Sequence, residues 1–272
     1  SLCYLEGEPV TAYAYYAPGR KYLNDGYLGY KDDGKDGIAE FIEATCNVHY
    51  GDDNYIDISF ANVTRNYSRL RIATMPNKPI TVDTEYFTPA GSSDMEQKGN
   101  YTLTSDEKGN AYLYGTFENN SEVTVKYREA PLKTYTFSQA TENAKSYALD
   151  ASIISLAGEG ITYNQIEEDV KKELDAGKTY INLILAPDAD EETLDAIHNG
   201  LAGARSWTIN LTLIGCKKIP YGGFMYWKML KSIVLPDVTE IEENAFLDCS
   251  GLQKVVLGNL TKVYGNVGKK GI

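Results

Sequence analysis

The sequence has few of the residues that usually carry chemistry. It contains only two histidines, His49 and His198, and no HExxH motif. Its four cysteines show no CxxC spacing, so they fit neither a zinc site nor a dense disulfide framework. No glycine-rich phosphate loop follows a strand-like run. We therefore expect a protein that is not an enzyme and that has no cofactor and no metal site.

Two alternatives remain open at this stage. Cys3 and Cys46 could pair if the protein is exported, although we favour buried free thiols for all four cysteines, including Cys216 and Cys249. The acidic loops at 31–37 and 51–57 carry oxygen ligands of the kind that calcium takes. Neither loop fits the EF-hand pattern, and tight turns also require Asp and Gly, so we interpret both loops as turns.

Positive charge and long apolar runs are scarce as well. The chain has 26 Lys and Arg against 38 Asp and Glu, which gives a net charge of −12. The phosphate backbone of a nucleic acid would be repelled, so we exclude nucleic acid as a partner. No apolar run approaches the roughly 18–20 residues that cross a bilayer, so we expect no transmembrane segment in this chain.

Tyrosine is abundant, with 22 Tyr against 7 Phe and 2 Trp. Tyrosine suits half-exposed sheet faces and contact surfaces. Short runs rich in β-branched and aromatic residues, separated by turn-forming clusters, occur at 8–16, 54–60, 68–74, 79–87, 100–106, 110–117 and 121–127. They predict an antiparallel β-sandwich domain over residues 1–138, with one short helix at 37–46.

The pattern changes beyond residue 138, and we place a second domain at 139–272. Ile166, Val170 and Leu174 recur every fourth residue and predict a helix that begins near Asn164 and ends at Gly177. A second helix, capped by Asp188 or Asp190, should carry Leu194, Ile197 and Leu201. Between the helices, Leu183 and Leu185 map onto Leu211 and Leu213 at a spacing of 28 residues.

The end of the chain repeats itself at a spacing of 22 residues. Leu230, Ile233, Leu235, Val238 and Ile241 recur as Leu252, Val255, Leu257, Leu260 and Val263. The same step backward reaches Thr208, Leu211, Leu213, Cys216 and Ile219. A fixed period of this length indicates a solenoid, in which each repeat buries its apolar face against its neighbours. The longer, helix-bearing first repeat would then cap the open end of the solenoid.

One repeat is similar to the BspA-like (Treponema-type) leucine-rich repeats of bacterial surface proteins. The family pattern is met at nine positions: Leu230, Ile233, Leu235, Pro236, Val238, Ile241, Ala245, Phe246 and Cys249. Its neighbours match partly, since Thr208 replaces the first Leu and Trp227 takes the Cys position. The resemblance covers nothing before residue 138. It implies a secreted or outer-surface protein, often a lipoprotein anchored through a cysteine outside this chain, that acts in adhesion or host contact.

The alternation of the repeat strands also predicts which residues face outward. Ile233 and Leu235 should point into the core, because successive side chains of a strand point to opposite faces. The outward ladder then consists of Asn210, Ser232 and Lys254 beside Thr212, Val234 and Val256. We predict that these six residues form a partner-contact face, with an ordinary solvated sheet face as the alternative.

Together these observations predict a mostly β (α+β) protein: an N-terminal antiparallel β-sandwich and a short C-terminal leucine-rich repeat solenoid with a helical cap. We expect a bacterial cell-surface or extracellular protein, anchored as an outer-membrane lipoprotein, that binds a protein or glycan at a cell or host surface without catalysis. One alternative is a glycan-binding accessory protein, whose exposed rings would be drawn from Tyr13, Tyr15, Tyr16, Tyr27 and Tyr30. A remote alternative is a hydrolase with its active site in the β domain.

Overall fold

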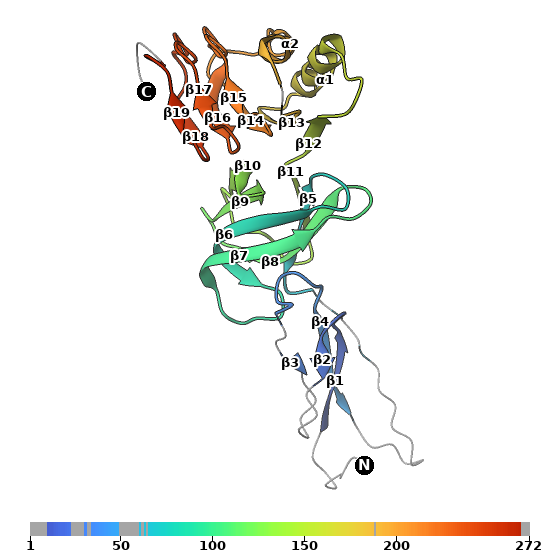
Figure 1. Cartoon of the computed structure of the whole chain (residues 1–272). Coiled ribbons are helices and arrows are strands. Elements are labelled where there is room, and N and C mark those ends of the chain that lie inside the picture. Colours follow the sequence, from blue (N-terminus) through green and yellow to red (C-terminus); the bar gives the residue numbers. More distant parts are fainter. Residues whose placement is uncertain are drawn as a thin grey trace.

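The chain is mostly β, and three regions follow one another along it (Figure 1). The computed structural model describes residues 10–22, 30–31, 34–48, 60, 63, 65–187 and 189–267. A narrow ribbon lies at the N-terminal end, a curled sheet lies in the middle, and parallel sheets with two helices lie at the C-terminal end (Figure 1). Within the described ranges, neither helix is long and apolar enough to cross a membrane.

The N-terminal ribbon is antiparallel. Strand β1 (Val10–Tyr16) pairs with β4 (Ile42–Val48), and β2 (Lys21–Tyr22) pairs with β3 (Tyr30–Lys31). The helix predicted at 37–46 is wrong, because residues 42–46 belong to β4 and residues 37–41 are not helical. Ile42, Thr45 and Val48 are β-branched, and such side chains favour a strand that has a partner to pair with.

The middle region is a single seven-stranded sheet and not the two-sheet sandwich that the short runs and turn-forming clusters predicted. Its strands are β5 (Ser68–Ala73), β6 (Pro79–Pro89), β7 (Glu96–Thr104), β8 (Asn110–Phe117), β9 (Glu122–Tyr127), β10 (Ala130–Thr136) and β11 (Ser146–Asp150). Their order is β10-β9-β6-β8-β5-β11, with β7 also paired to β6. The sheet curls into a half-barrel around its own core (Figure 1).

The long strand β6 explains this curl. Its residues 81–84 pair with β9, whereas its residues 87–89 pair with β8. Tyr86 lies between these two parts with a left-handed φ of 49°, which redirects the strand. Phe87, Leu113 and Val125 point inward and are 0% exposed. The curled sheet therefore surrounds this core on one side, and Ile214 and Val234 of the C-terminal region complete it.

Strand β11 lies beyond the predicted boundary between residues 138 and 139. It pairs in parallel with β5, with Leu149 opposite Ile72. The seven-stranded sheet is therefore completed by residues from both sides of that boundary.

The C-terminal region contains two parallel sheets. The larger consists of β12 (Ile153–Leu156), β13 (Tyr180–Leu185), β14 (Ile209–Ile214), β16 (Leu230–Leu235) and β18 (Lys254–Leu257). The smaller consists of the two-residue strands β15 (Lys218–Ile219), β17 (Glu240–Ile241) and β19 (Lys262–Val263). Two helices complete the region, α1 (Tyr163–Asp175) and α2 (Glu191–Gly200).

The predicted leucine-rich repeat solenoid with a helical cap is wrong. Helix α1 connects β12 to β13, α2 connects β13 to β14, and the two helices pack against each other. They are crossover connections between parallel strands, which such strands require, and not a cap on a stack of equal repeats. The 22-residue spacing does give the register of three strands, because Leu211, Ile233 and Val255 are direct partners. Between β13 and β14 the spacing is 30 residues and not 28, since Leu183 lies opposite Leu213.

The helix ends differ slightly from the prediction. Thr162 caps α1, since its side chain accepts a hydrogen bond from the Gln165 amide, so the helix starts before Asn164. Asp190 caps α2 in the same way, accepting from the Thr193 amide at 2.9 Å. Each cap satisfies an amide that has no partner within its helix.

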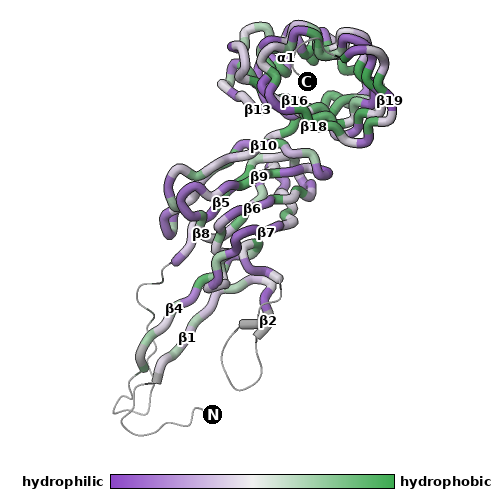
Figure 2. Tube along the Cα trace, turned by 90° about the vertical axis from the view of Figure 1, so that its left-hand side faces the viewer, coloured by the Kyte–Doolittle hydropathy of each residue, from purple (hydrophilic) through white to green (hydrophobic). Residues whose placement is uncertain are grey.

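Two buried clusters form the core. One fills the space between the five-stranded sheet, the helices and the short strands, where Phe224 and Phe246 stack at 5.3 Å. Figure 2 views this region from the side and shows hydrophobic stretches along β16 and β18. The other fills the curled sheet and also includes Ile214 and Val234. The outer face of the parallel sheet therefore closes the open side of the curled sheet, and this contact positions the candidate site.

Candidate ligand groove

A groove of about 620 Å³ lies between β9 and β10 on one side and the outer face of the parallel sheet on the other. All six residues of the predicted contact face line it: Asn210, Thr212, Ser232, Val234, Lys254 and Val256. The structure therefore brings the predicted residues together. It also shows that β10 packs against β13, β14 and β16. Part of the predicted contact face is therefore covered by β10.

The open part of the groove contains a row of polar side chains. The row crosses four adjacent strands and consists of Tyr180, Asn210, Ser232 and Lys254, each the register partner of the next. The Ser232 hydroxyl donates to the Asn210 side-chain oxygen at 2.7 Å, and the Asn210 amide group donates to the Thr179 carbonyl at 3.3 Å. At the usual spacing between strands, this polar row is roughly 14 Å long.

The other half of the predicted face is covered by the protein itself. Thr212 is 2% exposed, and its hydroxyl donates to the Pro131 carbonyl at 3.3 Å. Val234 is 7% exposed and belongs to the core under the curled sheet, against which Val256 also packs. These residues hold the two sheets together, because they bury apolar area between them.

Strand β10 forms the opposite wall of the groove and is held in place by the parallel sheet. The Tyr180 hydroxyl donates to the Thr134 carbonyl at 3.3 Å. The Lys133 ammonium lies 4.1 Å from the centre of the Tyr180 ring, a cation–π contact. Burial lowers the pKa of Lys133, and the charge of Asp150 opposes that shift.

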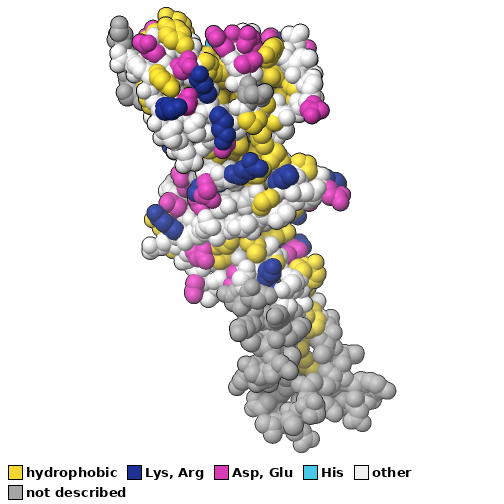
Figure 3. Space-filling model, in the orientation of Figure 1, with side chains coloured by type: hydrophobic (Ala, Val, Ile, Leu, Met, Phe, Trp, Pro, Cys, Tyr) yellow, Lys and Arg dark blue, Asp and Glu magenta, His cyan; other side chains and the backbone are white. Residues whose placement is uncertain are grey.

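Lysines dominate the charge of the groove. Lys126, Lys133, Lys231 and Lys254 line it, against the single carboxylate of Glu122. Figure 3 shows Lys and Arg side chains gathered where the C-terminal region meets the middle of the molecule. Lys126 pairs with Asp83, whereas the other three form no salt bridge within the described part of the chain. The groove is thus locally positive in a chain whose net charge is −12.

The sequence interpretation missed much of this site. The 22-residue spacing could have placed Lys231 and Gln253 beside the polar row, since they directly precede Ser232 and Lys254. No sequence signal identifies Lys126 or Lys133, because they come from β9 and β10. Their position depends on how the curled sheet packs against the parallel sheet.

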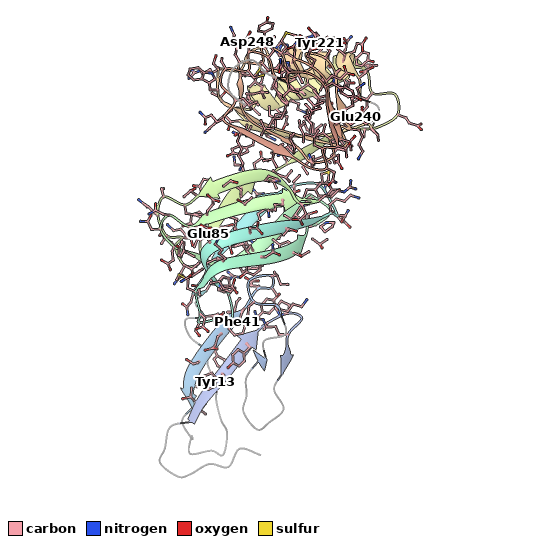
Figure 4. The ribbon with its side chains drawn as sticks, turned by 60° about the vertical axis from the view of Figure 1, so that its left-hand side comes forward. Tyr13, Phe41, Glu85, Tyr221, Glu240 and Asp248 are labelled. Atoms are coloured by element: carbon pink, nitrogen blue, oxygen red, sulfur yellow. The ribbon has the colours of Figure 1, made fainter. Side chains whose placement is uncertain are left out.

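The ribbon carries a second surface of interest. The rings of Tyr13 and Tyr15 lie 6.3 Å apart and only 6° from parallel, and Phe41 lies 6.0 Å from Tyr15. Tyr13 is 45% exposed, and Figure 4 shows it on the ribbon near Phe41. Tyr16 is also exposed but forms no ring contact among the described residues. Tyr27 and the side chain of Tyr30 lie outside the described residues.

His198, Cys216 and Cys249 belong to residue types that are often used in catalysis, but each packs against other side chains of the C-terminal region. His198 stacks on Trp227 at 4.9 Å, and burial lowers its pKa. Burial also raises the pKa of the thiols Cys216 and Cys249 to about 11. Cys46 is a free thiol. The remaining predictions about Cys3, His49, the loop at 51–57 and part of the loop at 31–37 lie outside the described residues.

No set of three or more His, Cys, Asp or Glu side chains in the described part of the chain is arranged to hold a metal ion. No family model matches the chain, and neither a curated protein nor a solved structure matches it significantly. The resemblance to BspA-like repeats therefore stays a prediction that rests on nine residues of one repeat.

Proposed function

We propose that the protein is a bacterial cell-surface binding protein without catalytic activity, which holds a protein or glycan partner in the groove beside β10. The observation that carries this proposal is the polar row, which lies open in a groove of about 620 Å³. Concave sites with a few convergent polar groups are the usual form of ligand sites.

The walls of the groove support this function because they are fixed before any partner arrives. Hydrogen bonds from Tyr180 and Thr212 to carbonyls of β10 hold the two sheets at one separation. The buried side chains of Ile214 and Val234 add an apolar contact between the sheets. A site that is ordered in the free protein loses less conformational entropy on binding.

The first test fills the groove. Ser232→Trp places a large ring in the centre of the polar row, and the whole chain is compared with the variant on an array of glycans and host-matrix proteins. We expect every ligand of the wild-type chain to bind the variant at least about tenfold more weakly, which corresponds to about 1.4 kcal/mol.

Ser138→Trp is the matched control, because it adds the same ring at an exposed position that does not line the groove. Its binding should equal that of the wild-type chain. If array ligands bind the Ser232 variant as tightly as the wild-type chain, the groove is not the binding site.

The near-parallel rings of the ribbon favour a second candidate function, glycan binding through stacking. Tyr13 and Tyr15 present ring faces side by side, with Phe41 next to them. Aromatic faces combine a large apolar surface with little conformational freedom to lose, which suits the flat faces of sugar rings. In this function the ribbon, and not the groove, recognises the partner.

Tyr13→Ala distinguishes the two candidates. If the ribbon binds glycan, this change should weaken binding on the array by about tenfold, because a ring worth roughly 1 kcal/mol or more of contact is lost. Tyr16→Ala removes an equally exposed tyrosine outside the ring stack and should leave binding unchanged. Equal effects of both changes, or no effect of either, would contradict recognition by the ring stack.

A further inference from the structure

We propose that the groove beside β10 binds a linear acidic glycan, whose sugars carry carboxylate or sulfate groups. This inference rests on the proposed function of the groove and adds the chemical class of the ligand. It is carried by three features of the described residues: unpaired lysines, neutral hydrogen-bonding groups between them, and a strand edge that is already occupied.

The first feature is the sign of the charge. Lys133 of β10, Lys231 of β16 and Lys254 of β18 all line the groove. No carboxylate within the described ranges forms a salt bridge with any of the three. The chain as a whole carries 12 more acidic than basic side chains, so this local excess of lysine departs from the average of its surface. A concave positive region raises the local concentration of anions and speeds their association.

Lys133 shows why an anion is the suitable partner. Its ammonium lies against the Tyr180 ring and is partly removed from water. The charge of Asp150 offsets part of this loss, but Asp150 forms its salt bridge with Lys178 and not with Lys133. A charge-assisted hydrogen bond donated by Lys133 to a bound carboxylate or sulfate would restore that interaction. Such bonds are stronger than those between neutral groups.

The second feature is the neutral part of the polar row. Asn210 and Ser232 in the row, together with Gln253 beside it, offer amide and hydroxyl groups that both donate and accept hydrogen bonds. Sugar hydroxyls require such dual partners, whereas an isolated inorganic anion requires donors alone. The row extends over roughly 14 Å across four strands, so it suits an extended chain better than a single ion.

The third feature argues against an acidic peptide. A peptide commonly adds itself to the edge strand of a sheet through backbone hydrogen bonds. Here the edge of β10 faces the parallel sheet, and its Pro131 and Thr134 carbonyls already accept hydrogen bonds from Thr212 and Tyr180. Pro131 also lacks an amide hydrogen. Recognition therefore depends on side chains in the groove.

The test uses the whole chain and four probes at matched low salt without divalent cations: polygalacturonate, dextran sulfate, neutral dextran and polyglutamate. Calorimetric titration should show binding of polygalacturonate or dextran sulfate that weakens at least tenfold at high salt, because mobile ions screen partly exposed charges. Neutral dextran and polyglutamate should bind at least tenfold more weakly.

The matched variants separate the groove from the general charge of the protein. The double change Lys231→Gln with Lys254→Gln should weaken binding of the acidic glycan at least tenfold. The control, Lys108→Gln with Lys171→Gln, removes two exposed lysines outside the groove and should change binding less than twofold. Equal losses in both pairs would show that any lysine serves and would overturn the proposal.

The remaining outcomes are equally decisive. Tighter binding of polyglutamate would assign the groove to an acidic peptide, and equal binding of dextran would assign it to a neutral glycan. Either result overturns this inference and leaves the groove as the binding site. If no acidic glycan binds, the inference fails alone when the Ser232→Trp test still identifies a groove ligand, and the proposed function fails too when that test identifies none.

Discussion

Replacing Phe224 with alanine is expected to lower the free energy of unfolding by about 4 kcal/mol, the usual cost of removing a buried phenylalanine. Phe224 is 0% exposed in the C-terminal core. Its ring stacks on Phe246 at 5.3 Å and meets the edge of Trp227 at 4.9 Å. The cavity would separate two connections between parallel strands, so the surrounding rings could close it only in part.

Urea unfolding followed by tryptophan fluorescence measures this loss, since Trp227 reports directly on the same cluster. Tyr221→Ala is the control: it removes an aromatic ring from a neighbouring turn, but that ring is 56% exposed and lies at the outer surface (Figure 4). Its cost should stay within about 0.5 kcal/mol. A loss below about 1 kcal/mol for Phe224→Ala would contradict the packing described for this core.

In the C-terminal region, the sequence period predicts which residues of neighbouring strands pair, but it does not predict the connections between the strands. The 22-residue spacing correctly places Leu211, Ile233 and Val255 side by side, because these positions are in-register neighbours. The same period suggested equal repeats with a cap, and that was wrong. Periodicity reports which residues share a face, whereas it does not report what connects the strands. Two of the connections are helices, and the first strand, β12, lies outside the period altogether.

In the middle region, the sequence pattern predicts strands and their buried faces but not the arrangement of the sheet. Alternation in the β9 segment places Val123, Val125 and Tyr127 on one face, and all three are buried. Alternation alone does not distinguish one curled sheet from two stacked sheets, since both bury every second residue. The curl of the single sheet depends on Tyr86, whose left-handed backbone lies where β6 changes its pairing partner from β9 to β8. The residue type at this position does not predict such a backbone conformation.

The candidate site was predictable only on one of its walls. Asn210, Ser232 and Lys254 follow from the repeat, because they share an outward face. Lys133 could not be found in this way, since its place in the groove results from packing between regions distant in sequence. The overall acidity of the chain also concealed the positive groove, because a net charge averages over the whole surface. A total of −12 therefore does not exclude a local anion site.

Arg20→Met is expected to destabilise the attachment of the N-terminal ribbon by about 3 kcal/mol, the scale for removing one partner of a buried ion pair. The Arg20 side chain is 2% exposed and pairs with Asp36, which is 18% exposed. The guanidinium also donates to the Ala90 carbonyl at 3.1 Å and lies 4.9 Å from the Phe41 ring. Methionine preserves the apolar contact with that ring, whereas it leaves the carboxylate of Asp36 without its counter-ion.

Hydrogen exchange of the β1 and β4 amides measures this loss, which should appear as roughly 100-fold faster exchange in the ribbon at about 1.4 kcal/mol per tenfold. Amides of β13 and β14 serve as the internal control and should exchange at the wild-type rate, because they lie in a separate sheet. Adding Asp36→Leu to Arg20→Met should recover most of the protection, since an apolar pair of similar size often replaces a buried ion pair without net cost. An equal loss in the single and double variants would show that the ribbon is held by the hydrogen bond from Arg20 to the Ala90 carbonyl, and not by the paired charges.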